Sequence, residues 1–311
     1  MFLKDEDALG FLALAILLIF PALGIALEFW GFIWVALLSA AVLLAGRKIG
    51  LERTAILSLL GYLVPFLIYG TEAIELLSLV PLAGLITLWG WRQNWRGNVT
   101  FFWSAVGVVV LAIVLALPFM AQGSAALPVD EMAELALQEY RSSDTVALWQ
   151  QQGLSEAQLR ELLQKTMGMF TLILPGFAAL LSLISFGFAV LVTERFLPRS
   201  EKRVPFIHWR LPWYAVWGII IGLGFYLAGD QFSWTLMRSA GINILVIYGG
   251  VTFVLGFAVC ACMLQSSAMP GWLKIMAVLA GVFFIYLTAI GLIMCGLLDL
   301  VVNIRRLPEE A

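Results

Sequence analysis

Residues 97–129 read GNVTFFWSAVGVVVLAIVLALPFMAQGSAALPV, and no charged side chain interrupts them. An α-helix crosses the hydrocarbon core of a bilayer with about 20 mostly apolar residues, so this run is long enough to span a membrane. Comparable charge-free runs recur at 8–27, 29–46, 54–71, 76–91, 166–193, 211–229, 239–273 and 275–298. They are apolar on every face, unlike the alternating strands of a membrane barrel. The sequence therefore predicts an all-α, polytopic transmembrane helix bundle.

The composition of the chain excludes a water-soluble fold. Of its 311 residues 62% are hydrophobic and 12% are charged, and that charged share is about half that of a soluble domain. The net charge is −2, so no strong positive field would attract nucleic acid. We expect the lipid bilayer to be the main partner of the chain.

The apolar runs predict nine helices, or eight if the first two are one. The expected bounds are 8–27, 29–46, 54–70, 72–92, 98–120, 166–193, 212–229, 241–264 and 271–303. These form a five-helix part at 1–120, an external helical cap at 121–165 and a four-helix part at 166–311. Lys4 is followed by three acids and no cleavage site is evident, which favours a retained first helix over a signal peptide.

Lysine and arginine are retained on the cytoplasmic side of a membrane, and this rule orients the bundle. Basic residues follow the second, fourth and sixth expected helices: Arg47, Lys48, Arg53, Arg92, Arg96, Arg195, Arg199, Lys202, Arg203 and Arg210. The pattern predicts a multi-pass membrane protein with a cytoplasmic N-terminus. Nine spans would leave Arg305 and Arg306 outside, so either the last hairpin differs or the rule fails there.

The cap segment carries helix signals. Pro128 followed by Asp130 suits a helix start, and Ser155 with Gln158 resembles a capping box. A helical cap over the outer mouth of the bundle and a solvated connecting hairpin are both compatible with this pattern.

Polar groups in or near the spans are the candidates for ligand binding, because unpaired charges there are costly. They are Glu28, Glu72, Glu75, Asp230 and Asn243. Glu72 and Glu75 share a helix face and could bind a cation or amine, or could lie in the headgroup layer at a helix N-terminus. Asp230 has Arg238 as a local partner. The Asn243 amide needs a partner, either on another helix or in a ligand.

Asp299, Arg305 and Arg47 are structural candidates. Asp299 is the most deeply placed acid, with Arg305 and Arg306 after it. Because Arg306 lies nearly two helical turns further on, a long arginine would have to reach back to pair with Asp299. An interfacial anchor and a pairing with another helix remain open.

The sequence contains no parts for catalysis, a cofactor or a metal site. His208 is the only histidine, and neither a zinc-binding HExxH nor a GxSxG nucleophile motif occurs. Cys260, Cys262 and Cys295 lie within apolar runs and form no metal or disulfide pattern. Glycines in the seventh and eighth helices predict close helix packing: Gly218, Gly222, Gly224, Gly249 and Gly250.

Three short motifs indicate a family. They are Ala45-Gly46-Arg47-Lys48-Ile49-Gly50, Trp89-Gly90-Trp91-Arg92, and Gly296-Leu297-Leu298-Asp299 followed by Arg305. In these motifs the chain resembles the YybS-like family of uncharacterised bacterial membrane proteins, which is distantly similar to the S components of energy-coupling factor transporters. That resemblance implies a location in a bacterial cytoplasmic (inner) membrane, six S-component-like N-terminal helices, an external ligand cavity and docking onto a coupling subunit. The small residues of the first helix lack the four-residue spacing of that docking surface.

Two functional hypotheses follow. The first is a protein that binds a small-molecule ligand, or helps to translocate it, through an externally open cavity. It would have no energy source of its own, since no ATP-binding motif is present. The second is a non-transporting membrane scaffold that binds a membrane protein partner or anionic lipid.

Overall fold

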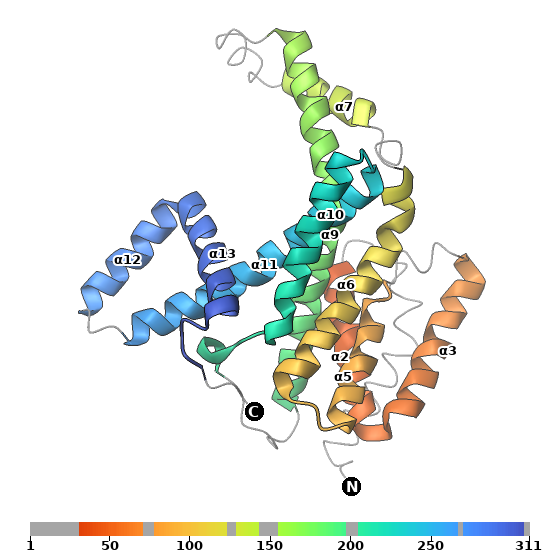
Figure 1. The fold of residues 1–311 in the computed structure, drawn as a ribbon. Coiled ribbons are helices and arrows are strands. Elements are labelled where there is room, and N and C mark those ends of the chain that lie inside the picture. Colours follow the sequence, from red (N-terminus) through yellow and green to blue (C-terminus); the bar gives the residue numbers. More distant parts are fainter. Residues whose placement is uncertain are drawn as a thin grey trace. The chain divides into compact units, whose positions relative to one another are not determined.

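The computed structural model describes residues 31–70, 78–122, 129–142, 155–196, 205–266 and 270–307 (Figure 1). These residues form helices joined by turns, and short 3-10 turns occur at Val80–Leu82, Phe206–His208 and Trp213–Ala215. The α-helices are α2 (Gly31–Ile49), α3 (Leu51–Tyr69), α5 (Ala83–Arg92), α6 (Gly97–Gln122), α7 (Val129–Ser142), α9 (Glu156–Phe196), α10 (Val216–Gln231), α11 (Thr235–Ser266), α12 (Gly271–Phe283) and α13 (Ile285–Val302).

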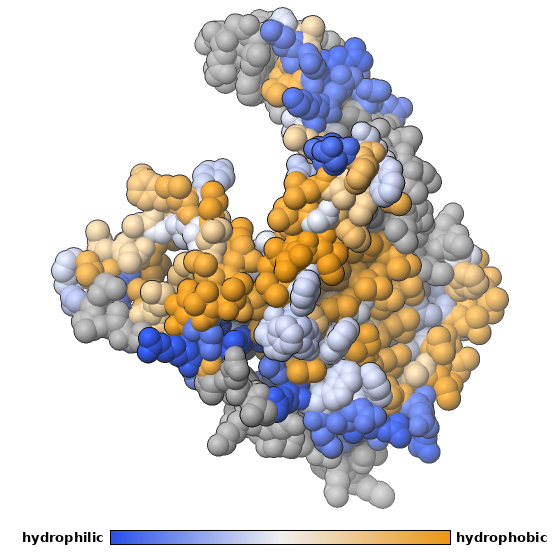
Figure 2. Space-filling model, viewed as in Figure 1, coloured by the Kyte–Doolittle hydropathy of each residue, from blue (hydrophilic) through white to orange (hydrophobic). Residues whose placement is uncertain are grey.

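Six helices in the described part are long and apolar enough to cross a membrane. Their apolar segments are Leu51–Ile68, Gly97–Val114, Ala157–Arg195, Trp213–Gln231, Thr235–Gln265 and Ile285–Val302. Large apolar side chains on these helices are exposed, and Figure 2 shows hydrophobic residues over much of their visible surface. Such a surface is stable in lipid and unstable in water. The predicted polytopic helical membrane protein is therefore confirmed.

Contacts divide the chain into two compact units. The first unit comprises residues 1–115, 179–220 and 247–311, and the second comprises 116–178 and 221–246. In the first unit α2 packs against α3 and α5, with Val42, Leu43 and Leu88 buried between them. A second cluster contains Val108 of α6 and Phe186 of α9. The core of this unit thus lies among helices from distant parts of the sequence.

The second unit contains α7 and the first half of α9. Ala133, Leu137 and Leu159 are buried there. The capping box at the start of α9 is confirmed, since the Ser155 N–H donates to Gln158 Oε1 (2.9 Å) and the Gln158 N–H donates to Ser155 Oγ (3.3 Å). α9 therefore begins ten residues before the expected bound of 166, and the prediction of helix in the cap segment is confirmed over α7.

The last expected helix, 271–303, is wrong as a single element. It is broken at Phe284, where φ is −98° and ψ is 47°, into α12 and α13. The two helices pack against each other, and Gly281 lies against Thr288. No proline lies at the break, and the nearest glycine is Gly281, three residues before it. α12 has 13 residues, so it is about 20 Å long, against a hydrocarbon core of about 30 Å.

Two glycines outside the predicted set allow α11 and α13 to cross closely. A side chain at Gly256 would collide with the Leu292 carbonyl, and one at Gly296 would collide with the Thr252 carbonyl. Backbone against backbone is the closest packing that helices achieve in a membrane. Among the predicted glycines, Gly218 lies against Tyr248, Gly222 against Ile244 and Gly250 against Leu180, whereas Gly224 and Gly249 have open space beside them.

Candidate functional site

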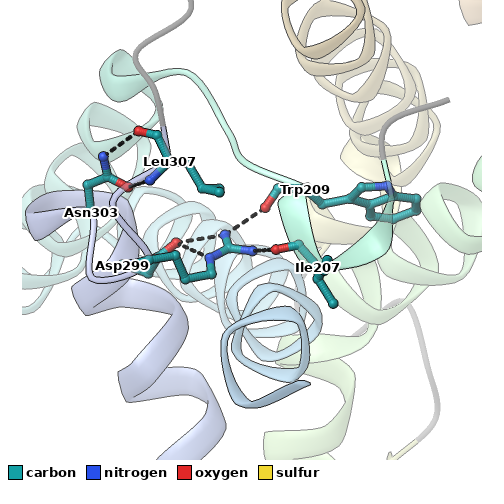
Figure 3. A network of polar contacts seen from close by, with 6 residues as sticks. Ile207, Trp209, Asp299, Asn303 and Leu307 are labelled. Atoms are coloured by element: carbon teal, nitrogen blue, oxygen red, sulfur yellow. Dashed lines mark hydrogen bonds and ion pairs between the residues drawn. The ribbon is translucent and has the colours of Figure 1, made fainter. Parts of the chain in front are cut away.

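A buried ion pair closes the end of α13. The helix ends at Val302, after which Asn303 takes a left-handed conformation (φ 52°) and its N–H donates to the Asp299 carbonyl (3.0 Å). This turn brings Arg305 back over Asp299, and the Arg305 N–H donates to Asp299 Oδ1 (3.1 Å). The Asn303 side chain holds Leu307 by two hydrogen bonds, to its carbonyl (2.8 Å) and from its N–H (3.0 Å) (Figure 3).

The Arg305 guanidinium donates four hydrogen bonds. Nε and Nη2 donate to Asp299 Oδ2 at 3.0 and 2.7 Å, Nη1 donates to the Ile207 carbonyl at 2.6 Å, and Nη2 donates to the Trp209 carbonyl at 2.7 Å. The side chains are 1% and 3% exposed for Arg305 and Asp299. Burial of two charges is tolerated when the geometry is good and the charged groups are hydrogen-bonded. Here four of the five N–H groups of the guanidinium have acceptors.

This network shows which side of the first unit the end of α13 occupies. An arginine does reach back to Asp299, and it is Arg305. Its contacts with Ile207 and Trp209 place the end of α13 beside the basic connection that follows α9. The nine-span scheme, which put Arg305 on the opposite side from that connection, is wrong here. The cause is the break at Phe284, which adds one reversal of the chain.

Other contacts bring the remaining basic connections to the same end. Arg92 Nη1 at the end of α5 lies 3.1 Å from Glu52 Oε1 at the start of α3. At the start of α6, the Phe101 ring is 6.2 Å from the Trp209 ring. We call residues 46–53, 91–97, 205–214 and 303–307 the basic end. In Figure 2 hydrophilic residues gather over the turn between α5 and α6, within this end.

The basic end contains a hollow of about 670 Å³ between α2, α3 and α5. We call it the arginine hollow. Its walls are Gly46, Arg47, Ile49, Gly50, Leu51, Glu52, Arg53, Leu88, Trp91 and Arg92. The turn between α2 and α3 passes through Gly50 at φ +87°, a conformation that other residues rarely adopt. The sequence marked Arg47 as a candidate, but it did not indicate that Trp91 and Arg92 lie beside it.

The three arginines of the hollow are held differently. The Arg47 guanidinium carbon lies 4.0 Å from the centroid of the Trp91 ring, in cation–π contact. Arg92 pairs with Glu52, although both side chains are more than half exposed, so this bond is weak. Arg53 is exposed and makes no ion pair within the described residues. Arg47 is therefore held over an aromatic ring, Arg92 is weakly paired with an acid, and the exposed Arg53 can contact a ligand.

Among the ligand candidates, Glu28, Glu72 and Glu75 lie outside the described residues, so the external solute cavity stays a prediction. Asp230 is in the described part, and its Oδ1 lies 3.5 Å from Nε of Arg238 with both side chains about half exposed. This is the local pairing that the sequence suggested as the simpler alternative.

Asn243 of α11 is 1% exposed and bonds to the backbone of α9. Its Oδ1 accepts from the Gly176 N–H (2.6 Å), and its Nδ2 donates to the Leu172 carbonyl (2.9 Å) and the Ser239 carbonyl (2.8 Å). Gly176 and Leu172 are four apart, so they are the donor and acceptor of one turn of an ordinary helix. Pro175 next to them has no N–H. The amide thus joins α9 and α11, with its oxygen and nitrogen both occupied by protein groups.

The described helices contain no group of three or more His, Cys, Asp or Glu side chains placed to hold a metal ion. Cys260 of α11 and Cys295 of α13 lie close enough for their thiols to interact. This is a further contact at the crossing of these two helices.

The apolar spans, the lipid-compatible surface and the basic end define a polytopic α-helical membrane protein. The chain belongs to the family described as Predicted membrane protein (DUF2232), which it matches over residues 11–300. No curated protein and no solved structure matches the chain.

Proposed function

We propose that this protein is a non-enzymatic scaffold of a bacterial cytoplasmic membrane, whose basic end faces the cytoplasm and binds the headgroups of anionic phospholipids. The observation that carries the proposal is the gathering of four basic connections at one end of the first unit. Its positive side chains besides the buried Arg305 are Arg47, Lys48, Arg53, Arg92, Arg96, Arg210 and Arg306. Glu52 is the single acid in the same four segments of the sequence.

Electrostatics support this orientation and this partner. Connections rich in lysine and arginine stay on the cytoplasmic side, where the leaflet contains anionic lipids. Each basic residue close to such a surface contributes about 1 kcal/mol of attraction, which falls off within a Debye length of about 8 Å at physiological salt. The cluster at the basic end supplies several such contributions side by side. A scaffold role fits the absence of catalytic motifs from the sequence.

The test is the composition of the lipid that remains with the protein. The full chain is extracted in mild detergent and purified, and its lipids are quantified by mass spectrometry against the total lipid of the same membranes. We expect enrichment of anionic over zwitterionic phospholipid, and loss of the enrichment after a wash at about 1 M salt, where screening acts within about 3 Å.

Two results would contradict the proposal. If the retained lipid has the composition of the bulk membrane, the basic end does not bind anionic phospholipid selectively. A non-lipid solute bound in stoichiometric amount would instead favour the solute-binding hypothesis, and the glutamates at 28, 72 and 75 would then be its first targets.

A further inference from the structure

We infer that the arginine hollow is a discrete site for a phosphate group, and that it holds the phosphate of one anionic phospholipid headgroup. The inference rests on the proposed function and names the residues within the basic end that would bind. It is narrower than the proposed function, because a positive surface can attract anionic lipids without having a defined binding site.

The first argument is the charge and chemistry of the walls. Arg47, Arg53 and Arg92 surround one hollow with Glu52 as its single acid, which leaves a net charge of +2. A guanidinium presents N–H groups in a planar fork that matches the oxygens of a phosphate, and such bonds are about twice as strong as neutral ones. A volume of about 670 Å³ has room for a phosphate and the glycerol next to it.

The second argument is that one of the donors is held in place, and another is loosely paired, before a ligand arrives. The cation–π contact with Trp91 holds the Arg47 guanidinium over that ring. Glu52 forms one exposed ion pair with Arg92, and a phosphate oxygen can take the place of its carboxylate. The start of α3 lines the hollow, and Gly50 supplies no side-chain cap to its first N–H groups. A phosphate in the hollow would therefore also lie near these N–H groups.

The third argument distinguishes a lipid from a soluble phosphate. An apolar stripe on α3 begins three residues after Arg53, hence on the same side of the helix. Ile56, Leu60, Leu63 and Leu67 form it, and they are 58%, 47%, 46% and 72% exposed. A phosphate in the hollow would therefore place acyl chains along a surface that is already apolar and open. A soluble phosphate would make no use of this stripe.

Native mass spectrometry of the full chain in mild detergent tests the inference. The probes are phosphatidylglycerol, phosphatidylcholine with the same acyl chains, and glycerol phosphate. One variant combines Arg47→Gln, Arg53→Gln and Arg92→Gln. Its matched control removes the same charge from the second unit, by Arg160→Gln, Lys165→Gln and Arg238→Gln.

The wild type and the control should bind one phosphatidylglycerol at least about 10-fold more tightly than phosphatidylcholine, because the choline cation of phosphatidylcholine cancels the charge of its phosphate and is repelled by the net charge of +2 in the hollow. The triple variant should lose this preference. Arg53→Gln alone should lose part of this preference. Because Arg53 is exposed and forms no ion pair with any residue that the structure describes, the unfolding temperature of this variant in phosphatidylcholine should match that of the wild type.

Each other outcome overturns the inference about the hollow, the proposed function, or both. If the wild type prefers phosphatidylglycerol and the triple variant keeps that preference, the hollow is not the site, while the basic end remains the lipid-binding surface. If the wild type shows no preference, both proposals fall. If glycerol phosphate displaces phosphatidylglycerol with equal affinity, the hollow binds soluble phosphates and the assignment to a lipid is overturned.

Discussion

Replacement of Arg305 by alanine should destabilise the protein more than any other single charge removal in the described part. The change leaves the Asp299 carboxylate, 3% exposed, without its counter-ion. It also leaves the carbonyls of Ile207 and Trp209 without the donors that lie 2.6 and 2.7 Å away. Breaking a buried, hydrogen-bonded ion pair from one side costs about 3–5 kcal/mol. For a chain of this size, about 2 °C per kcal/mol converts that into about 6–10 °C.

The assay is the thermal unfolding midpoint in mild detergent, followed by tryptophan fluorescence. Arg306→Ala is the matched control, because Arg306 is the exposed neighbour and should leave the midpoint within about 1 °C. The double variant Asp299→Ala with Arg305→Ala should be less destabilised than Arg305→Ala alone, since no unpaired charge remains buried. A midpoint for Arg305→Ala equal to that of the control would refute the argument, as would a double variant destabilised by at least as much as Arg305→Ala alone.

Three further predictions concern other contacts. Asn243→Ala should lower the unfolding midpoint, because the backbone groups of Gly176 and Leu172 each lose a hydrogen-bond partner, at a cost of about 1–3 kcal/mol per group. Asn243→Asp should retain the bond from the Gly176 N–H. Equal midpoints for Asn243→Ala and the wild type would contradict this prediction. Copper phenanthroline should oxidise Cys260 and Cys295 to an intrachain disulfide, detected by peptide mass spectrometry; a Cys262 disulfide instead would disprove their contact. A fluorescent reporter fused at the C-terminus should be accessible from the same side as a tag inserted at residue 200, and opposite accessibility would rule out the placement of α13.

The buried ion pair illustrates what could be predicted at the C-terminal end. An acid late in an apolar run followed by arginines indicated that an arginine could pair with it only by reaching back, and an interfacial anchor and a pairing with another helix stayed open as alternatives. The choice of Arg305 depends on the left-handed turn at Asn303. Its further partners, the carbonyls of residues almost one hundred positions earlier, are backbone groups, which leave no trace in the residue types.

Asn243 likewise shows which part of an interaction the sequence predicts and which part it does not. An amide at the start of a long apolar run predicted a hydrogen-bond partner on another helix or in a ligand. That the partners are the N–H of Gly176 and the carbonyl of Leu172 could not be predicted, because backbone groups are the same at every position. Pro175 was the one available signal of an irregular helix there.

The sequence by itself determined the class of protein, the positions of most spans and the basic connections between them. It could do so because the cost of placing charge or unpaired backbone in lipid is set along the chain, residue by residue. Only the tertiary structure decided that 271–303 is two helices, that the end of α13 returns to the basic end, and that three arginines share one hollow. Those features depend on which helices pack together, and packing between apolar helices follows from shape and small residues rather than from hydrophobicity, which is nearly uniform along these spans.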